Sequence, residues 1–314
     1  MKDTQRTLRE NWHGVLPRIG EVLILATFVL FILFANDVRE ATVQAFHFSL
    51  SVILPSIFPF TVLSGVYTGL QMSTQSMRGR RVARVLGVPK DALGICFLSL
   101  LVGFPQSGML VADLYNEGRI TREDASRIFP MLNNPSVGFV TVGVGLSCFG
   151  SIRIGIFLYA CVLLCARIVG LFGRGREEVG IARGRAAPSA RSLSEIVKEA
   201  SFTTVAVVGF VVFFTILRAI LDRLLLLPSL RLLALLTLEV TGGATGAAIQ
   251  SGLSLPLRLS LCAFSLGFGG VCVGMQSEIY LRRANLPVRP YYERKLAQGL
   301  LCALLVGLLS VFVL

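Results

Sequence analysis

The chain has 314 residues, of which 54% are apolar, and its mean hydropathy of +0.73 is that of a protein embedded in a bilayer. Charged residues make up only 15% and fall in short stretches between long uncharged runs, which excludes an ordinary soluble domain. The net charge of +12 would suggest nucleic acid as the partner of a soluble protein. In a membrane protein it is explained by Lys and Arg held in cytoplasmic loops, so no nucleic-acid partner is expected.

The first predicted element is a basic leader over residues 1–18, followed by an apolar run over 19–36. No small-x-small cleavage site follows this run, so we interpret it as an uncleaved first span and not as a secretory signal. A span needs about 20 apolar residues. The further runs of that length cover 41–71, 123–150, 152–172, 198–221, 256–281 and 291–314.

Two other apolar runs, 91–118 and 230–252, are interrupted near their middle by Gly103-Phe104-Pro105-Gln106-Ser107-Gly108 and by Thr241-Gly242-Gly243. Each interruption leaves two half-length helices, which predicts a re-entrant hairpin. The span after each hairpin is also broken, at Asn133-Asn134-Pro135-Ser136 and at Gly267-Phe268-Gly269-Gly270. Irregular backbone at membrane depth persists only where protein or a polar cavity surrounds it.

The distribution of Lys and Arg supports the hairpins. With a cytoplasmic N-terminus and two hairpins, most of the 30 basic residues lie in inside segments, namely 1–18, 78–90, 119–127, 173–198 and 282–295. If both interrupted runs spanned the membrane fully, the segments 119–127 and 173–198 would move outside. The positive-inside rule therefore favours the hairpin model, which puts the C-terminus outside.

The predicted organisation is thus a cytoplasmic leader (1–18), a first membrane half (19–172), a basic cytoplasmic linker (173–198) and a second membrane half (199–314). Each half contains a spanning helix, a hairpin, a broken span and a closing span, and the two hairpins enter from opposite sides. The predicted fold is an all-α polytopic membrane protein with an inverted repeat. In such transporters the substrate site lies near the midplane, between hairpin tips and broken helices.

The first half offers five candidate substrate-binding residues. Asn is a favoured N-cap and Pro is favoured at the first helical position, so Asn134-Pro135 predicts a half-helix whose positive end points into the membrane. An anionic group could dock there, with the side chains of Asn133, Asn134 and Ser136 as partners. At the first hairpin tip, Gln106 or Ser107 is expected to cap the returning helix. The competing interpretation at both places is a kink or turn whose polar groups satisfy one another.

The second half offers Glu239, Thr241, Gln276 and Ser277. An ionisable group such as Glu239 at membrane depth usually marks an ion path or a substrate contact. We interpret it as an ion-coupling residue, with proton or sodium as the ion, or alternatively as a carboxylate that caps the hairpin backbone. Glu278, close to Arg282, is expected to form an interfacial ion pair.

Enzyme chemistry is not expected, because His13 and His47 have no metal-type spacing and neither a Gly-rich phosphate loop nor a nucleophile elbow is present. The seven cysteines lie in apolar stretches and are expected to pack as small hydrophobic residues. No metal site and no cofactor are predicted. The expected partners are a small anionic solute and the lipid bilayer, and the oligomeric state is open.

The same polar motifs carry a family resemblance. The run from Gly103 to Gly108, Ala112-Asp113-Leu114-Tyr115, the run from Glu117 to Glu123, Asn133-Asn134-Pro135, Leu238-Glu239-Val240-Thr241, Gln276 and Arg289-Pro290-Tyr291 resemble the YlbJ-type sporulation integral membrane proteins. The resemblance covers about residues 20–314. It implies membership of the nucleoside-recognition, or Gate, domain superfamily, which is similar in arrangement to the concentrative nucleoside transporters. It further implies export of dipicolinate, a small planar dianion, from the mother cell toward the developing spore.

The leading hypothesis is a secondary transporter that moves a small carboxylate by alternating access. Nucleoside transport is the first alternative, and polar or aromatic residues that contact a base would favour it. The second alternative is a non-transporting membrane scaffold in spore or envelope assembly, for which a dry, packed interface between the hairpins would be expected.

Overall fold

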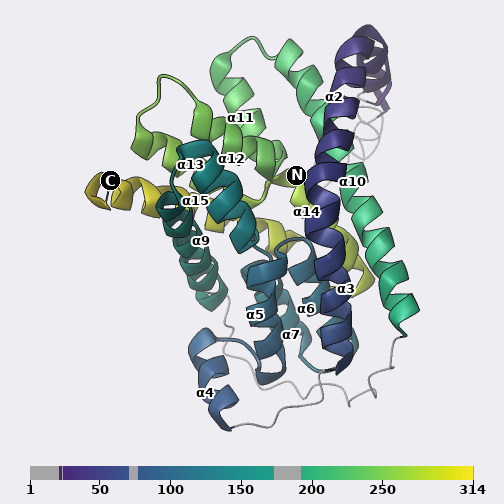
Figure 1. The fold of residues 1–314 in the computed structure, drawn as a ribbon, viewed down its shortest axis with the longest axis vertical. Helices are drawn as coiled ribbons and strands as arrows, with labels where there is room; N and C mark the ends of the chain where they lie inside the picture. The colour runs from purple at the N-terminus through teal and green to yellow at the C-terminus, as the bar shows by residue number, and fades with distance from the viewer. Residues whose placement is uncertain (1–20, 23, 71–76, 173–191, 314) are drawn as a thin grey trace, which may run out of the picture.

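A computed structural model describes residues 21–22, 24–70, 77–172 and 192–313 (Figure 1). The predicted leader and residues 173–191 of the predicted linker lie outside these residues. The described residues are almost entirely helical and contain no strand. The helices in chain order are Ile24–Leu33, α2 (Ala35–Phe48), the π-helical turn η1 (Ser49–Ile53), α3 (Leu54–Leu70), α4 (Met77–Leu86), the 3-10 turn η2 (Lys90–Ala92), α5 (Leu93–Val102), α6 (Gln106–Asn116), α7 (Arg122–Leu132), the π-helical η3 (Phe139–Leu146), α8 (Ser147–Phe149), α9 (Ile152–Phe172), α10 (Leu193–Leu224), α11 (Pro228–Leu238), α12 (Val240–Ile249), α13 (Leu255–Phe268), α14 (Gly270–Arg283) and α15 (Arg289–Val313).

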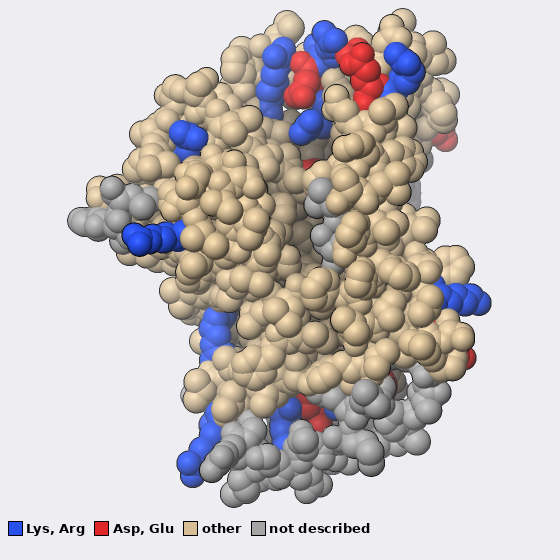
Figure 2. Space-filling model, in the orientation of Figure 1, with Lys and Arg blue, Asp and Glu red and all other residues tan. Residues whose placement is uncertain are grey.

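Four helical segments of the described chain are long and apolar enough to cross a membrane: Ile152–Phe172, Leu193–Leu224, Leu255–Arg283 and Arg289–Val311. They correspond to the last four predicted spans. Figure 2 shows charged side chains gathered mainly at the two ends of the long axis, with a broad band of other residues between them. Such a band suits the hydrocarbon core of a bilayer, and the prediction of an all-α membrane protein is confirmed.

The two predicted hairpins are pairs of short helices. α5 and α6 have 10 and 11 residues, and α11 and α12 have 11 and 10. At 1.5 Å per residue each arm is roughly 15 Å long, about half the thickness of a hydrocarbon core. In Figure 1 the first hairpin lies in the lower half of the molecule and the second in the upper half. Neither arm of either hairpin is long enough to span.

The breaks in the two following spans lie where the sequence predicted them. α7 ends at Leu132, residues 133–136 are non-helical, and the helix resumes at Val137. α13 ends at Phe268, Gly269 is non-helical, and α14 begins at Gly270; the two glycines have φ of 84° and 77°. The positive φ of both residues explains why glycines stand there.

The second hairpin corrects one detail of the prediction. Its turn lies at Glu239, which has an extended backbone, and not at Thr241-Gly242-Gly243, which form the first turns of α12. The glycines allow close approach instead, because a Cβ on Gly243 would lie 2.2 Å from Oγ of Ser265 on α13. Glu239 therefore forms the turn of the hairpin, and the glycines that follow let α12 pack closely against α13.

Two predicted boundaries also shift. α2, η1 and α3 follow one another without a loop from Ala35 to Leu70, so the break expected between 36 and 41 is helical. α10 begins at Leu193, inside the predicted linker. Ser192 and Glu195 form a reciprocal capping box there, with Glu195 N donating to Ser192 Oγ and Ser192 N to the Glu195 carboxylate.

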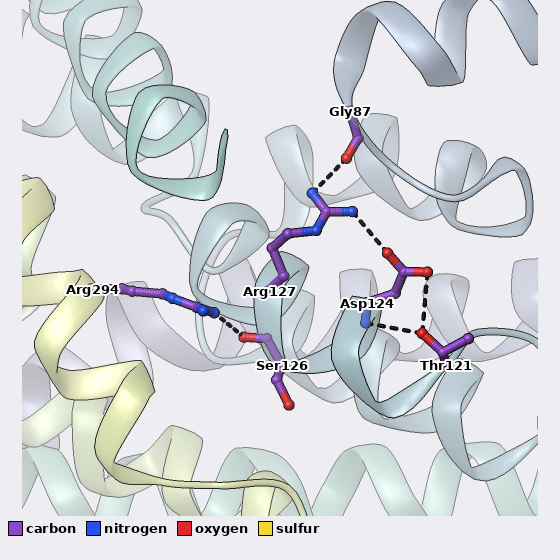
Figure 3. A network of polar contacts seen from close by, with 6 residues as sticks. All are labelled: Gly87, Thr121, Asp124, Ser126, Arg127 and Arg294. Carbon is purple, nitrogen blue, oxygen red and sulfur yellow. Dashed lines mark hydrogen bonds and ion pairs between the residues drawn. The ribbon is translucent and has the colours of Figure 1, made fainter. Parts of the chain in front are cut away.

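Basic segments that the charge pattern puts on one side of the membrane meet at one end of the molecule. Arg127, on α7, donates to the carbonyl of Gly87 at 2.6 Å and to Asp124 at 2.9 Å (Figure 3). Arg294, on α15, donates to the carbonyl of Ser126 at 2.7 Å, also shown in Figure 3. The segments around 87, 126 and 294 are thus tied together.

Candidate functional site

Each hairpin tip packs against the break of the span that follows it. A Cβ on Gly103, which has φ of 70°, would lie 2.6 Å from the backbone N of Ser136. A Cβ on Gly270 would lie 3.0 Å from the backbone N of Glu239. Phe104 connects the two halves, since its ring lies 3.9 Å from the Cβ position of Gly269. The four irregular segments therefore meet in one region of the protein.

A first polar cluster fills this region on the side of the first break. The side-chain amide of Asn133, fully buried, donates to Ser277 Oγ at 2.7 Å and to the Tyr291 hydroxyl at 3.0 Å. The Tyr291 hydroxyl donates to Ser277 Oγ at 3.1 Å. Ser107 Oγ is 2.9 Å from the carbonyl of Gly103 and 3.3 Å from Asn133 Oδ1, so its one proton is shared between these two acceptors. The cluster joins the first hairpin, the first break, α14 and α15.

A second cluster lies beside it, around Asn134. Gln298 Nε2 donates to Asn134 Oδ1 at 2.7 Å, and Lys295 Nζ donates to the same oxygen at 3.2 Å. The amide of Asn134 donates back to the carbonyl of Met131 at 2.7 Å. All three interacting side chains are nearly inaccessible, with exposed fractions of 3%, 1% and 2% for Asn134, Lys295 and Gln298.

The predicted caps are corrected by these bonds. Ser136, and not Asn134, caps the helix that resumes at Val137, since its carbonyl accepts from Val140 N and its Oγ accepts from Phe139 N at 3.3 Å. Asn134 is turned back toward α7 and cannot cap. At the hairpin tip neither Gln106 nor Ser107 caps α6, because Ser107 N already donates to the carbonyl of Gly103 at 3.0 Å, which places both residues inside the first turn.

Gln106 is fully buried, yet neither its amide nitrogen nor its amide oxygen has a hydrogen-bond partner among the described residues. Ser107, the next residue along α6, lies 3.3 Å from Asn133 through its hydroxyl. Gln276, 4% exposed, donates among the described residues only to Cys272 Sγ at 3.3 Å, a weak acceptor. Two buried amides at the convergence of tips and breaks therefore have unused hydrogen-bonding capacity.

Glu239 adopts the capping alternative. Its carboxylate accepts from the backbone N of Thr241 at 2.8 Å and of Gly242 at 2.7 Å. Arg218 reaches the same point from α10, since a Cβ on Gly242 would lie 2.7 Å from its Nη1 and 3.4 Å from Glu239 Oε2. A cation and a carboxylate thus share the second tip.

Four half-helices begin in this region, each with its positive end directed inward: α6, the helix from Val137, α12 and α14. The N-terminus of a helix carries partial positive charge and attracts anions. Of the candidate residues, Ser107, Asn133 and Ser277 are in direct contact, and Gln106, Asn134, Ser136 and Gln276 flank them. Glu239 and Thr241 lie at the second tip, joined to the others through α14.

Sequence reasoning missed Lys295 and Gln298 as parts of this region and quoted Tyr291 only as part of a motif. The signal was present, because residues 295 and 298 lie three apart, share one face of a helix and fall inside the predicted span 291–314. Lys295 was counted with the cytoplasmic charges, although a lysine inside a span marks a functional position by default. The ion pair predicted for Glu278 is confirmed, with Arg282 Nε at 2.6 Å.

The fold is all-helical, with two short hairpins, two broken spans and a buried polar centre. These features identify the class of the protein as integral membrane proteins. The chain is 25% identical to the sporulation integral membrane protein YlbJ of Bacillus subtilis strain 168, over 94% of this chain and 84% of that protein. This similarity supports the assignment to the YlbJ type that the motifs predicted. No protein-family model matches the chain. No solved structure matches it either.

Proposed function

We propose that the protein is a secondary transporter that moves a small carboxylate across the membrane by alternating access. The two hairpins and two broken spans form an inverted repeat similar to that of the concentrative nucleoside transporters, with the N-terminus cytoplasmic and the C-terminus outside. The solute binds where the tips meet the breaks. Dipicolinate is the first solute to test, because the family resemblance implies it.

The observation that carries the proposal is the amide of Gln106. A buried amide without a partner costs about 1–3 kcal/mol, and such groups are rare unless something else satisfies them. This one lies in the first turn of α6, one residue before Ser107, whose Oγ lies 3.3 Å from Asn133 Oδ1. A solute carboxylate would accept from the amide nitrogen, and the positive end of α6 would stabilise its charge.

The remaining candidate residues take roles around that contact. Asn133, Asn134, Ser136 and Ser277 shape the site, and Gln276 offers a further amide. Glu239 and Thr241 act at the second tip on the solute or on a coupling ion, with proton or sodium as the ion. The chemistry needs no enzyme activity and no cofactor.

The test is uptake of labelled dipicolinate into proteoliposomes by the wild type, by Gln106→Leu and by Gln250→Leu. Gln250 is exposed at the end of α12 and serves as the matched control. Saturable uptake that is lost in Gln106→Leu and kept in Gln250→Leu would support the site. Equal uptake by all three would contradict it.

Nucleosides and other small carboxylates are added as competitors in the same vesicles. Transport of a nucleoside but of no carboxylate would favour the first alternative. A correctly inserted protein that transports none of them would favour a membrane scaffold.

A further inference from the structure

The ammonium of Lys295 is buried in the protein with unusual partners. It donates to three oxygens: the carbonyl of Asn133 at 3.1 Å, Oδ1 of Asn134 at 3.2 Å and Oε1 of Gln298 at 2.8 Å. All three acceptors are neutral. No carboxylate among the described residues lies within ion-pair distance of this ammonium.

A buried charge is costly unless it is paired, so a lysine without a carboxylate needs another explanation. The three donors of an ammonium are matched here by three acceptors, which satisfies its hydrogen bonds but leaves its charge uncompensated. One acceptor is a backbone carbonyl at the point where the helix is broken, and the other two are side-chain amide oxygens. Carbonyl oxygens of this kind are the ligands that hold small hard cations in broken-helix transporters.

We propose that the Lys295 ammonium occupies an internal cation site at the first helix break, in the position that a free coupling cation would otherwise take. The lysine is a tethered cation, and its ammonium lies beside the residues proposed to bind the solute. Asn133 links the two, since its carbonyl binds Lys295 while its side chain belongs to the cluster with Ser107 and Ser277. A fixed charge there favours an anionic solute over a neutral one and removes the need for a sodium ion at this break.

The proposal deepens the proposed function, but the first experiment on it does not require transport. If the ammonium fills a cation site, then removing it leaves three oxygens that a small cation can bind. Lys295→Ala is therefore compared with wild type and with Lys198→Ala, which removes an exposed lysine of α10. Thermal unfolding is measured in detergent at equal ionic strength in sodium, potassium, methylammonium or choline chloride.

We expect Lys198→Ala to follow the wild type in all four salts. Lys295→Ala should melt lower in choline and recover by several degrees, saturably, in sodium or methylammonium. Failure of every small cation to stabilise a folded Lys295→Ala protein would overturn the proposal. A sodium effect on the wild type as large as that on Lys295→Ala would also overturn it, since the ammonium would then not be filling the site.

If Lys295→Ala does not survive solubilisation in choline, recovery of monodisperse protein becomes the readout. Recovery in sodium or methylammonium but not in choline supports the proposal, and aggregation in all salts while Lys198→Ala stays monodisperse refutes it. In vesicles, Lys295→Ala should acquire a sodium requirement beyond any that the wild type shows when choline replaces sodium. Absence of any uptake would count against the proposed function and leave the stability result standing.

Discussion

Replacing Gln106 by leucine tests the central site through stability as well as transport. Leucine is similar in size to glutamine and lacks polar atoms, so the change removes a fully buried amide that has no partner among the described residues. An unsatisfied buried polar group costs about 1–3 kcal/mol. We therefore expect Gln106→Leu to raise the free energy of unfolding by a similar amount and to abolish uptake.

The same substitution at Gln298 is the matched control. Gln298 is also buried, at 2% exposure, but its amide donates to Asn134 Oδ1 and its oxygen accepts from Lys295. Leucine there would deprive a buried ammonium of one acceptor, so we expect a loss of at least about 1–3 kcal/mol. Two buried glutamines should thus respond to one substitution with opposite signs.

The assay is thermal unfolding of both variants in one detergent, together with dipicolinate uptake into vesicles. One kcal/mol shifts the melting temperature by roughly 2–4 °C for a domain of 150–250 residues. Gln106→Leu should melt several degrees above wild type and Gln298→Leu several degrees below it. If Gln106→Leu lowers the melting temperature as much as Gln298→Leu does, or takes up dipicolinate as well as the wild type, then the amide of Gln106 does not bind the solute and the argument fails.

Three further predictions concern the tips and breaks. Gly103→Ala should lower the melting temperature and uptake, because its Cβ would lie 2.6 Å from Ser136 N at a φ of 70°, whereas Gly209→Ala, with open space around its Cβ, should change neither. Ser136→Ala should cost about 1 kcal/mol through loss of the bond from Phe139 N, and Ser136→Asp should restore it. Glu239→Gln keeps only one carbonyl oxygen for two backbone donors, so it should cost about 1 kcal/mol and, if the carboxylate couples transport, remove the effect of a proton gradient.

Each of these has a result that contradicts it. Identical melting temperatures for Gly103→Ala and wild type would show that the tip does not press on the break. A full loss of stability in Ser136→Asp would mean that the hydroxyl acts elsewhere. Uptake by Glu239→Gln that still follows the proton gradient would leave Glu239 as a cap alone.

The backbone of this fold was predictable because its causes are local. Pro135 and the pair Gly269-Gly270 interrupt helices by removing a donor or by taking positive φ, and both effects are properties of the residue itself. The charge pattern also predicts the sidedness, since basic segments collect at the cytoplasmic face, and this orientation stays a prediction. The position of the second tip was predicted wrongly. Glu239 ends one helix and caps the next through its carboxylate, but the sequence is equally compatible with a turn at the glycines that follow.

The partners of the polar side chains were not predictable, because they depend on tertiary packing. Asn134 looks like an N-cap in the sequence, but Lys295 and Gln298 from a helix about 160 residues away engage its oxygen. Ser136 caps the helix that begins at Val137 instead. When a side chain could form either of two favourable sets of hydrogen bonds, the tertiary contacts decide which set forms. The local sequence pattern does not contain that information.

The balance of charge at the centre supports the proposal of an anionic solute. The four helix N-termini at the tips and breaks are offset by the C-termini of α5, α7, α11 and α13, which end at the same points, so the charged side chains decide the balance. Among the carboxylates of the described residues, Glu239 is the one at the tips, where it caps α12 and lies close to Arg218. The ammonium of Lys295 and the guanidinium of Arg218 outnumber this carboxylate, and burial away from water strengthens their field. A neutral nucleoside would leave that field uncompensated, whereas a carboxylate at Gln106 would offset it.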